Sequence, residues 1–382
     1  MNIMKKKPEE KKAKTTKSKK ETTKKTTTTK KTTTRKKKEP VVQEPVKPFL
    51  SIVIPCYNCR NFIERLLDSI VNQTKKIPLE VIIQDDNSTD NFMELVEPYK
   101  TKLDIKYFKN EPRDIHCPGN TRLDGMKHIS GEWLTFIDND DMFELTMIED
   151  FTQTIEDQKP DTLIVTEFRE FNYDNGAYGK EYDRKNITWL HGKFYNVKFL
   201  RDNNITFKEN LETNEDLYFN MNVFAAITMA DKTYTMAKSY TYKWIYNEDS
   251  ISRKMFREAE FYIDKSFKEY INASIEPWWN VLKAHPEAEP YIFKRTCYVM
   301  LYAYFYYQSL YYRNKFKHYR PNRDAFEDFL NEVKTRFGAT AMDIVAVVYS
   351  DDTVYNDIRA DAMNGCKPFI ESDSFYNFLE KF

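Results

Sequence analysis

The stretch Trp133-Leu134-Thr135-Phe136-Ile137-Asp138-Asn139-Asp140-Asp141 decides how the rest of the chain is interpreted. Its first part is apolar and rich in aromatic and β-branched residues, which predicts a buried strand. Three carboxylates follow within four residues, and they would repel one another unless a cation lay among them. One interpretation is a site for a divalent metal that carries a nucleoside diphosphate. The other is a solvated turn, because Asp and Asn are favoured in turns.

The net charge of zero over 382 residues conceals a basic tail and an acidic body. Residues 1–47 contain 17 Lys and one Arg against five Glu, a net charge of +13, and the remaining residues carry −13. The tail is almost entirely Lys, Thr and Glu and ends in a proline-spaced linker, which predicts disorder. It could bind nucleic acid or an anionic surface, or it could be a solubilising tail without a fixed partner. Charge alone does not choose between these.

Cysteine usage and the amino terminus favour an intracellular protein. The five cysteines are an odd number without framework spacing, which favours a reducing compartment over secretion. No apolar run marks a signal peptide, and the longest apolar stretch, residues 297–312, falls short of the roughly 20 residues of a spanning helix. We expect a cytoplasmic protein, soluble or peripherally membrane-associated, without a transmembrane segment.

Strand-like and helix-like segments alternate from residue 49 onward. Strands are expected at 49–54, 79–83, 105–108 and 133–137, and helices at 63–73, 92–99 and 120–129. This alternation predicts an α/β fold with a mostly parallel sheet and helices on both faces. Ligands of such sheets bind beyond the carboxyl ends of the strands, and three polar clusters fall there. They are Pro55-Cys56-Tyr57-Asn58, Asp85-Asp86-Asn87-Ser88 and Asp138-Asn139-Asp140-Asp141.

These clusters, with their order and spacing, resemble the nucleotide-sugar half of family 2 glycosyltransferases. The motifs are Ile52–Asn58, Asp85–Asp90, Pro118–Gly125 and Gly131–Trp133 leading into the Asp cluster. Leu190–Tyr195 and Asn214–Phe219 resemble the acceptor half of the same family. The resemblance implies a GT-A, Rossmann-like fold over residues 48–255, divided into a nucleotide-sugar half (48–142) and an acceptor half (143–255). Residues 256–382 would form a helical, Tyr-rich subdomain.

The resemblance also implies which residues bind a UDP-sugar donor. Pro55 and Tyr57 would flank the uracil, and Asp86 would hydrogen-bond the base. Arg122 would lie near the pyrophosphate, or else form a structural pair with Asp124 or another carboxylate. Asp138 and Asn139 are further donor-binding candidates.

For the metal, Mn²⁺ or Mg²⁺, the resemblance points to the Asp138-x-Asp140 motif. Asp140 is the first choice as a ligand, with Asp138 and His191 as further candidates, and Asp141 could be structural. A metal there would stabilise the leaving diphosphate. Trp189 and Trp244 could stack on a sugar or belong to the core.

Glu215 and Asp216 begin an apparent helix, where capping is the alternative to catalysis. The resemblance assigns the general base to Asp216, which would take a proton from the acceptor hydroxyl while UDP is displaced with inversion. After residue 255 helices are expected at 256–275, 289–313 and 324–337. The second has tyrosines on most faces, which predicts a buried helix. A homo-oligomer contact, an acceptor surface or a membrane-interface platform are the alternatives.

The leading hypothesis is a metal-dependent, inverting glycosyltransferase of the hexosyltransferase type that uses a UDP-sugar. The tail suggests a polyanionic acceptor, such as modified DNA or a phosphate-rich envelope polymer. The alternative is a catalytically silent scaffold of the same fold that binds nucleic acid or membrane through the tail.

Overall fold

The computed structural model describes residues 47–183, 188–247, 260–313, 319–365 and 374–380. The chain divides into two units, Met1–Pro45 and Val46–Phe382, and the second holds every described element. The expected disorder of the basic tail therefore lies outside the described residues, apart from Lys47.

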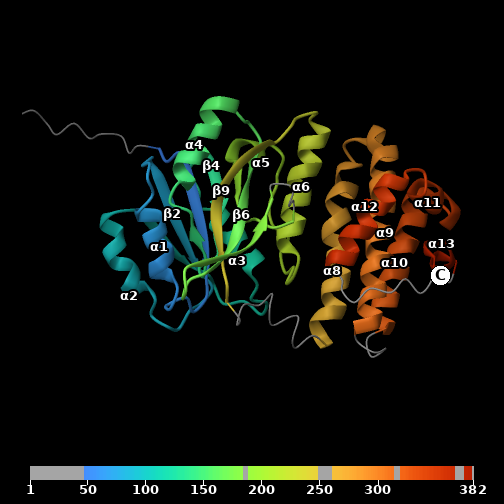
Figure 1. Cartoon of the computed structure of the whole chain (residues 1–382), viewed down its shortest axis with the longest axis horizontal. Coiled ribbons are helices and arrows are strands. Elements are labelled where there is room, and N and C mark those ends of the chain that lie inside the picture. The colour runs from blue at the N-terminus through green and yellow to red at the C-terminus, as the bar shows by residue number, and fades with distance from the viewer. Residues whose placement is uncertain (1–46, 184–187, 248–259, 314–318, 366–373, 381–382) are drawn as a thin grey trace, which may run out of the picture. The chain divides into compact units, whose positions relative to one another are not determined.

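The first half of the second unit confirms the expected parallel sheet. Strands β1 (Leu50–Cys56), β2 (Leu79–Asp85), β3 (Asp104–Lys109) and β4 (Trp133–Phe136) lie in the order β3-β2-β1-β4. All three pairings among them are parallel. The carboxyl ends of β1, β2 and β4 consequently meet at one edge of the sheet (Figure 1).

Helices cover both faces of this sheet, because consecutive buried side chains of β1 and β2 point to opposite faces and both sets need a partner. Ile52, Ile54 and Ile83 belong to one core cluster, which also contains buried residues of α1 (Ile63–Val71) and α4 (Met147–Gln158). Val53 and Ile82 belong to the other, which includes residues of α5 (Val197–Asp202) and α6 (Glu215–Met229). Helix α3 (Pro118–Met126) packs on β1 and β2 on this second side. The short α2 (Met93–Val96) and the 3₁₀ helix η1 (Glu97–Thr101) lead into β3.

Beyond β4 the sheet is mixed, whereas the sequence predicted a mostly parallel one. Strand β8 (Lys193–Asn196) is antiparallel to both β4 and β6 (Leu163–Asn172), and β9 (Thr235–Ile245) is parallel to β6. The β7 strand (Ala177–Tyr182) is antiparallel to β6, and β5 (Met142–Phe143) to β9. The β6–β7 connection shows the physical reason: it is too short for the crossover of a dozen or more residues that a parallel pair needs.

The C-terminal part is helical, as expected. Its elements are α8 (Glu260–Val281), η2 (Pro286–Ala288), α9 (Glu289–Arg313), α10 (Tyr319–Phe337), α11 (Ala341–Val348), α12 (Asp352–Gly365) and α13 (Phe375–Leu379). Helix α8 packs along α6 (Figure 1), and one core cluster continues from Phe219 of α6 to Phe267 of α8 and Tyr304 of α9.

The tyrosine-rich helix α9 is largely core. Phe305 and Tyr307 are buried, and Tyr298, Tyr302 and Tyr306 are half-buried. The side chains of Tyr311 and Tyr312 lie outside the described residues. Among the described helices, none is long and apolar enough to cross a membrane.

Helix α3 depends on a glycine at its contact with β1. A Cβ at Gly125 would lie 2.6 Å from Cγ1 of Val53, which is a steric overlap. Gly125→Ala should therefore lower the free energy of unfolding by about 1–3 kcal/mol, because this overlap outweighs the better helix propensity of Ala. Urea denaturation measures the change.

The matched control is the double variant Gly125→Ala/Val53→Ala, which removes the overlapping methyl. The double variant should lose less free energy of unfolding than the two single variants lose together. If the losses of unfolding free energy were strictly additive, the contact with Val53 would not be the reason why a glycine is needed at position 125.

Candidate active site

The three polar clusters predicted at strand ends do come together. Cys56 at the end of β1 pairs with Asp85 at the end of β2, and Asp138 follows β4 on the other side of β1. A hydrogen bond links two of the clusters directly, because the side-chain amide of Asn139 donates to the Pro55 carbonyl at 2.8 Å. This amide therefore contacts protein and fixes the acidic loop against the first turn.

The two neighbouring acids at the end of β2 have different partners. Asp85 accepts hydrogen bonds from the Ser88 backbone N–H at 2.8 Å and from the Tyr107 hydroxyl at 2.7 Å, so it orients its own turn. Asp86 instead accepts from the Asn110 side chain at 2.7 Å and lies 2.8 Å from Nδ1 of His116.

An aromatic ring lies near Asp86. The Tyr57 side chain is 60% exposed, and its ring centroid is 6.4 Å from that of His116. The ring of Tyr57 is therefore accessible, and His116 is a second ring beside it; stacking of Tyr57 on a ligand stays a prediction. Arg113 adds a cation, with Nε 3.7 Å from Asp86 Oδ1.

Arg122 joins the two halves of the site. Its side chain is almost completely buried, and its two terminal nitrogens lie 2.5 Å from Asp138, 2.9 Å from Glu215 and 3.1 Å from Asp216. Burial alone would lower the pKa of Arg122, but these three carboxylates outweigh it and raise the pKa well above its ordinary value. The structural pair with Asp124 or another carboxylate, the alternative considered from the sequence, is thus formed with these three carboxylates, whereas Asp124 pairs with Arg113 and Lys127.

A second group of side chains has the composition of a metal site. Asp138, Asp141 and His191 each place one ligand atom within 4.8 Å of the others. Nδ1 of His191 is buried and has no hydrogen-bond partner among the residues that the structure describes. Carboxylate oxygens suit Mn²⁺ or Mg²⁺, so Asp138 and Asp141 fit the expected cation, whereas an imidazole is more typical of other transition metals.

Asp140, the ligand favoured from the sequence, is outside this group in the structure. Its carboxylate accepts a hydrogen bond from the Asn247 side chain at 3.1 Å, and its carbonyl accepts one from Arg65 of α1. Asp141 accepts hydrogen bonds from the Tyr242 hydroxyl and from the Ile245 N–H at 2.7 Å, which ties the loop to β9. Burial, and then repulsion from neighbouring carboxylates, raises the pKa of both Asp140 and Asp141.

Glu215 and Asp216 begin α6 and point into the same site. Besides Arg122, Asp216 is approached by the Leu190 backbone N–H at 3.4 Å. Burial raises the pKa of Asp216 to about 7, against the lowering effect of Arg122. Burial also raises the pKa of Glu215. Both acids thus face a buried cation at the junction of the two halves, and a role in the site can coexist with a favourable position in the first helical turn.

Aromatic side chains form the wall beside His191. Its ring stacks on Tyr242 at 4.4 Å, and the centroids of Trp189 and Trp244 are 5.2 Å apart next to it. Both tryptophans are half-buried, so each is partly core and partly accessible. The neighbouring Lys193 is fully buried, and burial lowers its pKa to about 7.

Sequence reasoning missed three nitrogen-bearing side chains that contact the acidic clusters: Arg65, Arg113 and His116. Arg113 and His116 lie in the connection from β3 to α3, where no motif distinguishes them. Arg65 lies on α1, where a charged residue in an amphipathic helix is indistinguishable from a solvated one. The signal that could have found them is position, since all three flank acidic clusters at strand ends.

Comparison with known proteins gives the family. Residues 51–227 match the model of Glycosyl transferase family 2. Over 208 residues the chain is 28% identical to the poly(ribitol-phosphate) beta-N-acetylglucosaminyltransferase TarS of Staphylococcus aureus, covering 49% of this chain and 35% of the relative. It is 29% identical over 214 residues to a poly(ribitol-phosphate) beta-glucosyltransferase of Bacillus spizizenii, covering 52% and 32%. The chain thus spans about a third of the length of these curated relatives.

A solved structure agrees on the fold. The crystal structure of S. aureus TarS 1-349 in complex with UDP-GlcNAc superposes with a TM-score of 0.59 at 21% identity, over 83% of this chain and 92% of that one. This superposition covers 83% of the chain, much more than residues 51–227, so it includes helices that follow the sheet as well as the sheet itself. Residues 51–227 therefore belong to glycosyl transferase family 2, within a chain that has the GT-A fold and a helical C-terminal region.

Proposed function

We propose that this protein is a metal-dependent glycosyltransferase that moves a sugar from a UDP-sugar to an acceptor hydroxyl with inversion. The observation that carries the proposal is the contact of Arg122 with Asp138 on one side and with Glu215 and Asp216 on the other. The Arg122 side chain thus brings the candidate donor-binding loop next to the candidate base. A transfer reaction needs the donor and the base at the same place.

On the donor side, Asp86 would hydrogen-bond the uracil and Tyr57 would stack on it. Asp86 is buried beside His116 and Asn110, while the Tyr57 ring is open to solvent. Arg122 would contact the pyrophosphate, for which a guanidinium is well suited. The TarS structure of the same fold holds UDP-GlcNAc, which supports a UDP-sugar as the donor for this chain.

Asp138, with Asp140, Asp141 and His191, would hold Mn²⁺ or Mg²⁺. When bound, such an ion stabilises the negative charge that develops on the leaving diphosphate. Two sets of candidate ligands share Asp138: the group that it forms with Asp141 and His191 in the structure, and the sequence motif that it forms with Asp140. Asn139 keeps this loop in place through the Pro55 carbonyl.

On the acceptor side, Asp216 would accept the proton of the attacking hydroxyl. A pKa near 7 suits a general base that works at neutral pH, since about half of the groups are then ionised and each remains a competent proton acceptor. Glu215 lies beside it on Arg122 and would help to orient that guanidinium.

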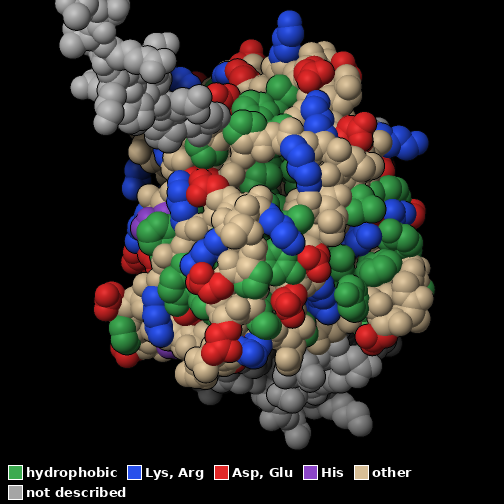
Figure 2. Space-filling model, turned by 90° about the vertical axis from the view of Figure 1, so that its left-hand side faces the viewer, with side chains coloured by type: hydrophobic (Ala, Val, Ile, Leu, Met, Phe, Trp, Pro, Cys, Tyr) green, Lys and Arg blue, Asp and Glu red, His purple; other side chains and the backbone are tan. Residues whose placement is uncertain are grey.

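The acceptor we propose is a phosphate-rich polymer. Two relatives are named as transferases acting on poly(ribitol-phosphate), and the tail of this chain carries +13. On the face of the second unit shown in Figure 2, acidic and basic side chains are interspersed, without one broad basic patch. The tail is therefore the better candidate for attracting a polyanion.

Metal dependence tests the donor site. UDP release from a panel of UDP-sugars should require Mn²⁺ or Mg²⁺, stop with EDTA and return when metal is added back. Asp140→Asn should lower kcat/KM by about 100-fold or more, as expected when charge stabilisation of the leaving group is weakened. Asp202→Asn, an exposed carboxylate on α5, is the matched control and should leave turnover unchanged. Full turnover in EDTA would contradict the metal, and no turnover with any donor would favour the silent scaffold.

The base is tested by Asp216→Asn. This variant should lower kcat by about 10²–10⁴-fold, because no group remains to take the acceptor proton, while UDP affinity stays near the wild-type value. NMR of the glycoside should show an anomeric configuration opposite to that of the donor. Wild-type kcat in Asp216→Asn would remove Asp216 from the mechanism, and a retained configuration would exclude direct displacement.

The tail is tested by deleting residues 1–47. The Michaelis constant for a poly(ribitol phosphate) acceptor should rise, and its dependence on salt should weaken, because fewer counterions are released on binding. The constant for the UDP-sugar should not change. Identical acceptor kinetics with and without the tail would show that the tail does not bind the acceptor.

A further inference from the structure

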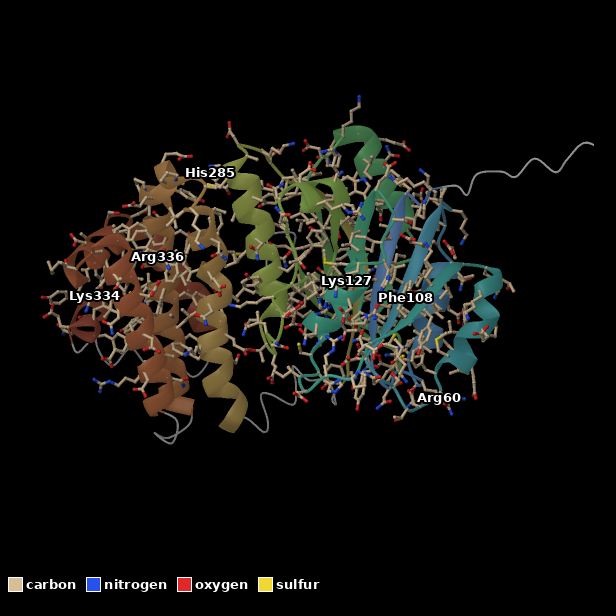
Figure 3. All side chains as sticks on the ribbon, turned by 180° about the vertical axis from the view of Figure 1, so that it is seen from behind. Arg60, Phe108, Lys127, His285, Lys334 and Arg336 are labelled. Atoms are coloured by element: carbon tan, nitrogen blue, oxygen red, sulfur yellow. The ribbon has the colours of Figure 1, made fainter. Side chains whose placement is uncertain are left out.

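A cavity outside the candidate active site lies where the end of α5, the first half of α6 and the end of α8 meet. Its volume is about 400 Å³, within the range of roughly 300–1,000 Å³ that small-molecule sites occupy. His285, labelled in Figure 3, lies just past the end of α8 and lines it. The complete lining is Asn203, Asn204, Thr206, Phe207, Tyr218, Asn222, Pro277, Asn280, Val281, Ala284 and His285.

The lining carries no Asp, Glu, Lys or Arg, although these types make up 31% of the chain. Among the charged residues next to the lining in sequence, Lys208 pairs with Glu276, Asp202 pairs with Lys198, and Lys283 is exposed. A charged ligand would therefore find no carboxylate, ammonium or guanidinium group in the lining to pair with. The cavity is suited to a neutral molecule.

Four asparagines give the lining its hydrogen-bonding character. Two have fixed amides, since Asn203 donates to the Phe199 carbonyl and Asn222 to the Tyr218 carbonyl, both at 2.9 Å. The side chains of Asn204 and Asn280 make no hydrogen bond to any other described residue. Each amide offers two donors and an acceptor, which matches hydroxyl groups that both donate and accept.

Beneath the amides the cavity has an apolar floor. Phe207 is buried and stacked on Phe219 at 4.4 Å, and Pro277 is buried in α8. A wholly apolar ligand would leave the amides without partners, whereas a molecule with one C–H face and a hydroxyl edge satisfies both parts.

The shape of the cavity is built into the backbone. Pro277 lies inside α8, where it lacks an N–H and displaces the carbonyl one turn before it. Asn204 has a φ of 52°, so the chain leaves α5 through a left-handed residue. A preformed cavity costs less to fill than one that must open.

We propose that this cavity binds a neutral sugar or polyol unit at a site separate from the catalytic centre. Tyr218 and Asn222 stand on α6, the helix whose first turn carries Glu215 and Asp216. If the proposed function holds, a polymeric acceptor with such units would be held at a second point near the base, which raises its effective concentration there.

Direct binding is measured by saturation-transfer NMR on the full chain, with glucose, N-acetylglucosamine and ribitol as probes and with UDP and Mn²⁺ present to fill the donor site. At least one probe should bind with a Kd of about 1–10 mM, as expected for so small a neutral ligand. Glucose 6-phosphate should bind more weakly than glucose. Ala284→Trp fills the cavity and should weaken binding at least 10-fold, while Lys283→Trp, on the adjacent exposed residue, should not.

Asn280→Leu is a second variant that removes an amide without filling the cavity, and it should weaken binding at least fivefold. Thermal unfolding checks that each variant is folded. Absence of binding by all three probes, or equal binding in wild type and the folded Ala284→Trp and Asn280→Leu variants, would overturn the proposal. UDP binding is followed in the same samples. Its absence from the wild type would overturn the proposed function and leave the sugar site standing.

Discussion

The structure depends on one buried cation. The guanidinium of Arg122 is 3% exposed and is held by carboxylates from two different parts of the chain, Asp138 after β4 and Glu215 and Asp216 on α6. A buried charge costs several kcal/mol unless it is paired and hydrogen-bonded. The loop after β4 and the start of α6 must therefore both close on α3, which carries Arg122, for any of these groups to be accommodated. The parallel part of the sheet and the start of α6 are thereby fixed to each other by electrostatics as well as by packing.

Helix α3 can supply this cation only because it approaches its neighbours closely. A Cβ at Gly119 would lie 2.9 Å from Cβ of Glu215, so a larger residue there would push the start of α6 away. Asn120 of α3 also binds the segment that precedes α6. Its side chain accepts a hydrogen bond from the Asn210 backbone N–H at 2.9 Å and donates one to the Asn210 side chain at 3.2 Å. Two glycines within nine helical residues weaken the helix by about 1 kcal/mol each relative to Ala. That cost is explained by the position they allow Arg122 to take.

Sequence alone predicted the parts of this arrangement that depend on local pattern. The strands β1 to β4 and helices α1 and α3 follow from short-range periodicity, and the convergence of Asp86 with Asp138 follows from parallel strands ending at one edge. The mixed direction of β6, β8 and β9 was not predictable, because it depends on which distant strands pair. For the same reason the sequence could name Asp140 and His191 beside Asp138 but could not show that Asp141, and not Asp140, would join Asp138 and His191 in the group of candidate ligands. The turn after β4, held by Tyr242 and Arg65, decides which carboxylates face inward.

The same turn leaves an imbalance of charge that bears on how the site would operate. The candidate site contains five carboxylates but only two guanidinium groups among the described residues, those of Arg122 and Arg65. The carboxylates are those of Asp138, Asp140, Asp141, Glu215 and Asp216. Only Asp138, whose burial is outweighed by Arg122 and then by His191, has a lowered pKa; the other four are raised, with burial as the largest cause. A nucleoside diphosphate would add further negative charge, so its binding and that of a divalent cation should each favour the other. The acidic loop would then serve less to bind a metal by itself than to make donor binding conditional on one.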